Sequence, residues 1–198
     1  MNSNGFFNYM SENSHNSLFR NGKVFTKRDI NGSDAGSLGI DLEKVEMPVI
    51  NARDQLGKKK IYLDKNGFEL IQSNINHLNI NFFNNREVID KYYIHCADFV
   101  REKTGAKNVY AFDHNIRSAS GKKNKKMIKG GQQVQGPAHI VHGDYTLTSA
   151  PERFRQLAKP AGKNDTLRLI LGKSNSLLSE DNVIETLANG RFAIINLW

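Results

Sequence analysis

The sequence predicts an α+β fold in which helices lie outside a β-sandwich or jelly-roll core. Two observations predict it. Strand-like stretches occur at 107–117, 138–148 and 191–198, and one long helical pattern precedes them at about 86–104. With 198 residues, the chain is long enough for one domain with a sizeable core.

The chain divides into a leader and one domain. Residues 1–22 are polar and rich in Asn and Ser, so we predict a loosely ordered leader. Residues 23–198 are predicted to form the single domain. A β-hairpin is predicted at 60–71, because two short apolar stretches flank the turn-forming residues at 64–67.

The helix at about 86–104 has clear signals at both ends. Asn84 and Asn85 can cap its start, and Gly105 ends it as a C′ glycine. A second helix opens near Pro151 and runs to about residue 159. The apolar stretch at 167–171 is either a strand or the end of a helix. Helical spacing is shared by Val88, Ile89, Tyr92, Tyr93, Cys96, Phe99 and Val100.

The most informative residues are His142 and Asp144, two apart in the predicted strand 138–148. Residues at i and i+2 of a strand point to the same face, which Thr146 shares and Tyr145 does not. An imidazole and a carboxylate side by side make two-thirds of a facial metal triad for non-haem Fe(II). Taken alone, His-x-Asp is a weak signal, which an exposed pair of structural residues also explains.

Several short motifs around this pair fall in a recognisable order. They include Gly136 to Thr146, the helix start at 149–153, the upstream run 112–117 and the terminal run 191–198. Further matches lie at 51–54, 64–70 and 104–106. Over roughly residues 45–198 the chain resembles the CmcJ/AsaB/NvfI-like hydroxylase/desaturase family.

The resemblance implies a double-stranded β-helix (jelly-roll) oxygenase that uses Fe(II), 2-oxoglutarate and O2. Its expected substrate is a small organic molecule, such as a secondary metabolite. His142 and Asp144 are then the proximal metal ligands, and no catalytic residue beyond the ligands is predicted. The reaction would be a hydroxylation or a desaturation, and the oxidation itself would come from the metal and cosubstrate.

The family pattern continues beyond Trp198, typically with Arg-Pro, and its distal histidine and 2-oxoglutarate-binding arginine lie further on. This chain has no histidine after His142. Three interpretations stay open. The chain is C-terminally incomplete and lacks the last strands of the jelly roll, or His114 supplies the third ligand, or the chain is a degenerate relative that acts as a binding module.

Five further residues are candidates for lining the cofactor or substrate pocket. Arg117 is suited to meet an acidic group or to form a surface salt bridge, and His114 to line the pocket or to pack between strands. Asn196 and Trp198 alternate onto one face of the last predicted strand and could border the cosubstrate. Thr146 shares the predicted metal-ligand face.

Composition limits the remaining functions. The single cysteine, Cys96, excludes an internal disulfide and favours a reducing cytoplasm. No apolar run is long enough to span a bilayer. The net charge of +8 comes largely from lysine clusters at 58–60 and 122–129, which lack interleaved aromatics, so nucleic acid is an unlikely partner. Some relatives carry a methyltransferase label, but the sequence has no glycine-rich loop of the Rossmann type.

Overall fold

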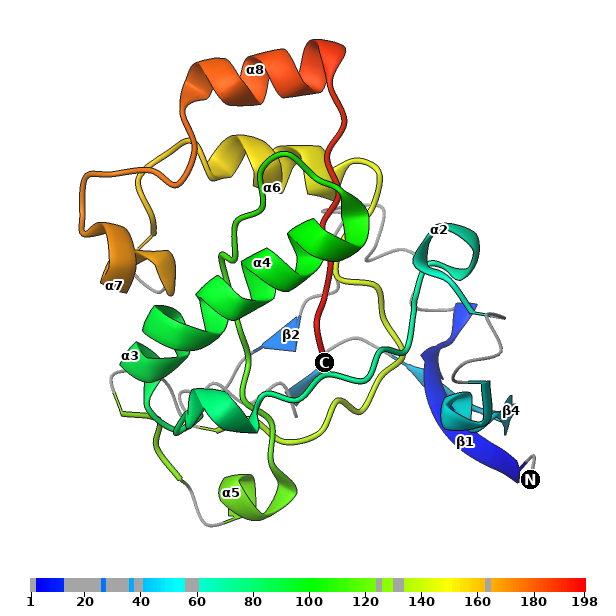
Figure 1. The fold of residues 1–198 in the computed structure, drawn as a ribbon. Coiled ribbons are helices and arrows are strands. Elements are labelled where there is room, and N and C mark those ends of the chain that lie inside the picture. Colours follow the sequence, from blue (N-terminus) through cyan, green and yellow to red (C-terminus); the bar gives the residue numbers. More distant parts are fainter. Residues whose placement is uncertain are drawn as a thin grey trace. The chain divides into compact units, whose positions relative to one another are not determined.

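The computed structural model describes residues 3–12, 26–27, 36–37, 41–55, 61–123, 126–129, 134–162 and 165–198 (Figure 1). The chain divides into two compact units, and the single domain predicted for 23–198 stays a prediction. Unit 1 contains Met1–Thr26, Ser37–Asn79 and Ala138–His142, and unit 2 contains Lys27–Gly36, Ile80–Pro137 and Gly143–Trp198.

Unit 1 contains an antiparallel strand pair. Strand β1 (Ser3–Met10) pairs with β4 (Leu42–Val49), with Ser3 opposite Val49 and Met10 opposite Leu42. The leader predicted to be loosely ordered therefore contains a strand. Its aromatic residues favour strands, and its partner lies more than thirty residues further along the chain, which local composition cannot reveal. A second two-stranded sheet pairs β2 (Thr26–Lys27) with β3 (Gly36–Ser37).

The predicted hairpin at 60–71 is wrong for its described residues. They contain one helical turn, α2 (Leu63–Asn66), which ends at Gly67 in the left-handed region with φ 75°. The Asn66 side chain accepts a hydrogen bond from the Tyr62 backbone N–H at 3.1 Å. This local bond and the Gly67 N–H to Leu63 carbonyl bond of 2.9 Å stabilise a turn of helix instead of a strand. Short 3-10 helices occur at Ala52–Gln55 and Asn76–Leu78.

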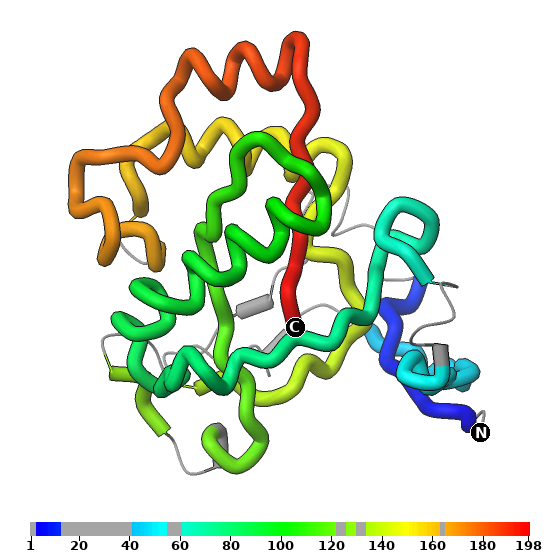
Figure 2. The backbone as a smooth tube through the Cα atoms, viewed as in Figure 1, coloured from blue at the N-terminus to red at the C-terminus, as the bar shows by residue number. Residues whose placement is uncertain are grey.

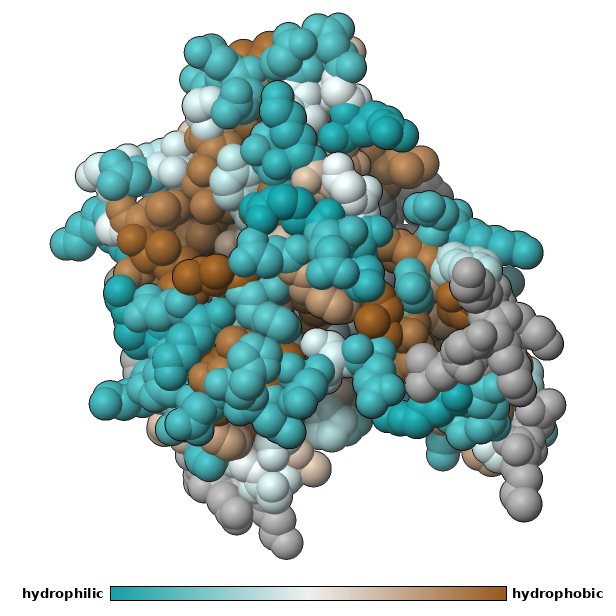
Figure 3. Space-filling model, in the orientation of Figure 1, coloured by the Kyte–Doolittle hydropathy of each residue, from teal (hydrophilic) through white to brown (hydrophobic). Residues whose placement is uncertain are grey.

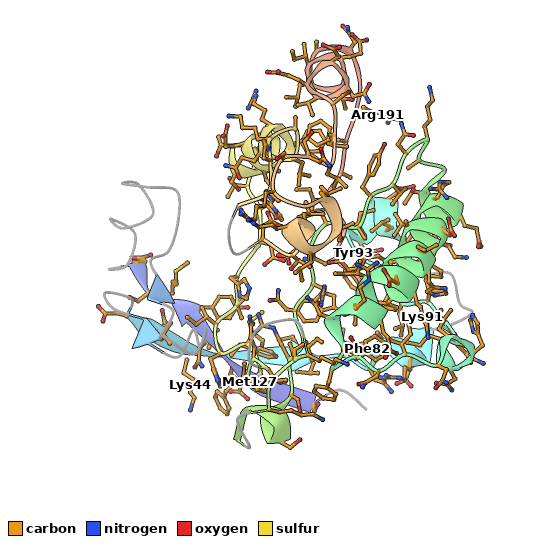
Figure 4. The ribbon with its side chains drawn as sticks, turned by 90° about the vertical axis from the view of Figure 1, so that its left-hand side faces the viewer. Lys44, Phe82, Lys91, Tyr93, Met127 and Arg191 are labelled. Atoms are coloured by element: carbon orange, nitrogen blue, oxygen red, sulfur yellow. The ribbon has the colours of Figure 1, made fainter. Side chains whose placement is uncertain are left out.

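The long helix predicted at 86–104 is confirmed in unit 2. It comprises α3 (Asn85–Glu87), a π-helical turn (Val88–Tyr92) and α4 (Tyr93–Thr104). The Asn84 side chain caps the start by accepting from the Arg86 N–H, and Gly105 ends the helix with φ 67°. One face of the helix buries Val88, Ile89 and Tyr93, against which Ile80, Phe82 and Ala111 pack. Figure 4 shows Tyr93 on the inner side of the helix.

A second core of unit 2 lies among the C-terminal helices. These are α6 (Ser149–Gln156), α7 (Leu167–Leu171) and α8 (Glu180–Asn189), with α5 (Ala119–Lys123) before them. The stretch at 167–171, which the sequence left undecided, is a helix. The Ser179 side chain caps α8 by accepting from the Asn182 N–H. The buried cluster consists of Leu157, Ala161, Leu167, Leu178 and Val183.

The structure has no regular strand at 107–117, 138–148 or 191–198. Residues 138–142 lie beside β1, where the Val141 N–H donates to the Asn8 carbonyl at 2.9 Å. Pro137 has no N–H to donate and Gly143 is a poor strand former, so a continuous ladder is disfavoured here. Figure 2 shows the last eight residues running on from α8 as an extended path. The jelly-roll core stays a prediction.

Candidate functional site

A pocket in unit 2 is the candidate site. It has a volume of about 510 Å³ and forms between the segment entering α6 and the C-terminal segment. Carboxylate, phenol, hydroxyl and amide groups share its lining with apolar side chains, as is typical of small-molecule sites. The lining residues are Asp144, Tyr145, Thr146, Leu147, Ala150, Ile194 and Asn196.

A reciprocal cap fixes the segment that follows Asp144. The Thr146 N–H donates to Ser149 Oγ at 2.8 Å, and the Ser149 N–H donates to Thr146 Oγ1 at 3.0 Å. This is the arrangement of a capping box, with serine in place of the usual Glu or Gln. Thr146, predicted as a pocket residue, therefore both lines the pocket and anchors the start of α6.

Asn196 contacts Asp144 directly. Its Nδ2 donates to Asp144 Oδ2 at 2.5 Å across 52 positions of the sequence. The C-terminal segment that carries Asn196 is held on α6, because the Phe192 ring stacks on Phe154 with centroids 4.5 Å apart and an interplanar angle of 7°. The contact therefore joins two segments that are both attached to α6.

His142 belongs to unit 1, whereas Asp144 belongs to unit 2. His142 Nδ1 lies 2.8 Å from the Ile140 carbonyl oxygen, which can only accept a hydrogen bond. A neutral His142 ring with its proton on Nδ1 carries its lone pair on Nε2, the form in which imidazole binds metals. Because 138–148 is not a strand, the argument that His142 and Asp144 share a strand face no longer applies.

The donor types of His142 and Asp144 fit Fe(II), which accepts imidazole nitrogen and carboxylate oxygen. They are two of the three protein ligands that a facial triad requires. Across the described residues, no group of three His, Cys, Asp or Glu side chains is gathered as a metal site. His15 lies outside the described residues.

His114 packs inside unit 2 beside α4. Its Nδ1 lies 2.8 Å from Tyr93 Oη, and the two rings meet edge to face with centroids 5.5 Å apart. Burial lowers the pKa of His114, although the nearby Asp113 carboxylate acts in the opposite direction. Burial also raises the pKa of Tyr93, so burial favours the neutral forms of both the phenol and the imidazole.

Tyr145, predicted to point away from the face of His142 and Asp144, is part of the pocket wall. Burial raises the pKa of Tyr145, while Arg153 lowers it by charge and by a hydrogen bond. Arg153 in turn pairs with Asp165 at 3.2 Å and lies over the Phe112 ring at 5.3 Å. These contacts fix the tyrosine at the pocket edge.

Three predicted pocket residues, His114, Arg117 and Trp198, do not line this pocket. Arg117 Nη1 donates to the Gly136 carbonyl at 3.2 Å, and Trp198 is 95% exposed. The lysine cluster at 58–60 lies outside the described residues, and the cluster at 122–129 lies partly outside them. Of the remainder, Lys126 Nζ lies 3.4 Å from the centroid of the Phe83 ring.

The sequence missed Tyr145, Leu147, Ala150 and Ile194 as pocket residues. The helix signal at Pro151 could have indicated that Leu147 and Ala150, three apart, lie on one face where the helix begins. Ile194 is two residues from Asn196, the spacing that places extended residues on one side. Exposed apolar side chains elsewhere on unit 2 include Ile94, Leu169, Ile170 and Ile184. On the face drawn in Figure 3, hydrophobic surface (brown) appears between hydrophilic side chains (teal).

Residues 7–198 match the model of the family described as Oxidoreductase/YMDC permease-like domain. The chain belongs to this family. A relative from Methylophilus leisingeri, named as an uncharacterized protein in the dcmA 3' region, is 40% identical over 96% of this chain and 87% of its own length. Oxidoreductase AN1597 of Emericella nidulans is 28% identical over 71% of this chain and 40% of its own length. No solved structure matches.

The Oxidoreductase/YMDC permease-like domain family is of oxidoreductase type, which confirms the coarser part of the sequence prediction. The finer resemblance to the CmcJ/AsaB/NvfI-like family stays a prediction, as do Fe(II) and 2-oxoglutarate. None of the described helices is long and apolar enough to cross a membrane.

Proposed function

We propose that this chain is an Fe(II)- and 2-oxoglutarate-dependent oxidoreductase that hydroxylates or desaturates a small organic molecule. The observation that carries the proposal is the donor pair His142 and Asp144, an imidazole nitrogen and a carboxylate oxygen of the kinds that Fe(II) binds, in a chain of an oxidoreductase family. The pocket supports it, because Asp144 lies in its wall beside apolar side chains that suit an organic substrate.

The proposal gives each part of the site a role. His142 Nε2 and the Asp144 carboxylate would hold the metal, and with 2-oxoglutarate and O2 the bound metal would supply the oxidation of a substrate C–H bond. The half-buried Ala150 and Ile194 would pack against the apolar part of the substrate. Tyr145 would orient a polar group of the substrate through its hydroxyl.

A single comparison tests the metal ligands. The protein is incubated with Fe(II), 2-oxoglutarate and O2, with and without candidate substrates, and succinate is measured. We expect succinate from the wild type and at least ~100-fold less from His142→Ala, because losing a ligand removes the metal geometry. The matched control is His139→Ala, an exposed histidine three residues earlier. Equal turnover by His142→Ala and wild type would refute the assignment.

A non-catalytic binding module is the second candidate. It is favoured by the lack of a three-residue metal group within the described ranges. Iron analysis of the same protein separates the two functions. An enzyme of the proposed type takes up about one Fe(II) per chain, whereas a binding module takes up none.

A further inference from the structure

We infer that Asn196 is a positioning residue, which orients the Asp144 carboxylate for metal binding. The contact that carries this role is the hydrogen bond that Asn196 Nδ2 donates to Asp144 Oδ2 at 2.5 Å. This role rests on the proposed function, because Asp144 is its proposed metal ligand. Asn196 itself would not touch the metal.

The chemistry of the contact suits this role. An asparagine amide N–H can donate a hydrogen bond to a carboxylate without bringing a positive charge to it. The bond therefore orients the carboxylate plane and does not neutralise the carboxylate, which can still bind a cation. Hydrogen bonds to a ligating carboxylate from residues behind it generally determine how well that carboxylate binds. Both side chains are in the wall of the same pocket.

The supporting structure makes the contact precise. Asp144 is followed after one residue by the Thr146–Ser149 cap, which holds the peptide on the start of α6. Asn196 follows Phe192, whose ring stacks on Phe154 within α6. Helix α6 is thus a common frame for the donor and the acceptor, and a rigid frame is what a binding site needs to hold a ligand in place.

A purely structural tie between the two segments makes a different prediction. It would contribute to the free energy of unfolding and would leave the metal affinity of the folded protein unchanged. Metal affinity and thermal stability therefore need to be measured on the same variants.

The experiment is a titration of the full chain with Co(II) alone, followed by its visible absorbance. Asn196→Ala and Asn196→Leu both remove the donor, and leucine keeps a similar side-chain volume. The matched control is Asn189→Ala, which removes an asparagine amide from the Glu185 carboxylate on the exposed side of α8. Thermal unfolding of each metal-free variant is recorded in parallel.

We expect both Asn196 variants to bind Co(II) about 10- to 100-fold more weakly, with a shifted absorbance spectrum, and Asn189→Ala to bind as the wild type does. Folded Asn196 variants with wild-type affinity and spectrum overturn the role of Asn196, whatever their thermal stability. A wild type that binds no Co(II) overturns the proposed function as well. The two failures are thereby distinguishable, and the leucine variant decides the outcome if the alanine variant does not fold.

Discussion

At the scale of single residues, the His114–Tyr93 pair shows how burial selects a protonation state. Burial raises the pKa of the Tyr93 phenol and lowers the pKa of the His114 imidazole. Both groups are therefore neutral near pH 7, where Tyr93 Oη and His114 Nδ1 lie 2.8 Å apart. Burial disfavours the charged imidazolium, so protonation of His114 is coupled to the stability of the fold.

The stability of the protein should depend on pH through His114. Since the folded-state pKa is below the unfolded value of about 6.5, the unfolded state binds the extra proton first as pH falls. Stability is then full above pH ~6.5 and is lost as pH decreases toward the lowered folded pKa. We expect His114→Gln to show a smaller loss of unfolding free energy than the wild type between pH 7 and pH 5, measured with urea.

The matched control for this pH effect is His77→Gln, which removes an exposed histidine. It should keep the pH dependence of the wild type. An identical pH dependence in His114→Gln and the wild type would contradict the coupling. The flanking Asp113, which opposes the effect of burial, is retained in all three proteins.

At the scale of elements, the helices near 86–104 and 151–159 could be predicted from the sequence, whereas strand β1 could not. Asn84, Gly105 and the apolar spacing between them are local signals, and the structure has the helix they predict. Strand β1 depends on β4, more than thirty residues away, and the predicted strand at 138–148 lacks a ladder. The alternation of side chains along a strand predicted that Tyr145 and Asp144 point to opposite faces, yet both line the pocket. Residue spacing predicts a face only where the segment is in fact a strand.

The end of α4 depends on a glycine. Gly105 has φ 67°, and a Cβ added there would meet nothing within 4 Å, so the strain of a substitution comes from the backbone alone. Gly105→Ala should lower the free energy of unfolding by about 1 kcal/mol. Gly162→Ala is the matched control, because Gly162 also has open space but lacks this positive φ. Equal stabilities of the two variants in urea unfolding would contradict the cap.

At the scale of the whole molecule, buried apolar side chains are unevenly distributed. Every buried apolar side chain of the described residues belongs to unit 2. Most lie in the cluster of Val88, Ile89 and Tyr93 or in the cluster that includes Leu167, and Ile128 and Val134 are buried outside these two clusters. The described part of unit 1 contains the β1–β4 pair, whose side chains are exposed or half-buried. Since packing supplies most of the free energy of folding, the units should differ in local stability.

Hydrogen exchange can measure this difference directly. A two-stranded pair without a buried face is marginally stable in water. We therefore expect the β1 and β4 amides to exchange by local opening, at least ~100-fold faster than the α4 and α8 amides, although both sets are hydrogen-bonded in their elements. Mass spectrometry of peptides covering 3–10, 42–49, 93–104 and 180–189 gives the comparison within one sample. If the β1 amides were as protected from hydrogen exchange as the α8 amides, the strand pair would open only when the rest of the molecule unfolds. Its stability would then not follow from the burial of the β1 and β4 side chains.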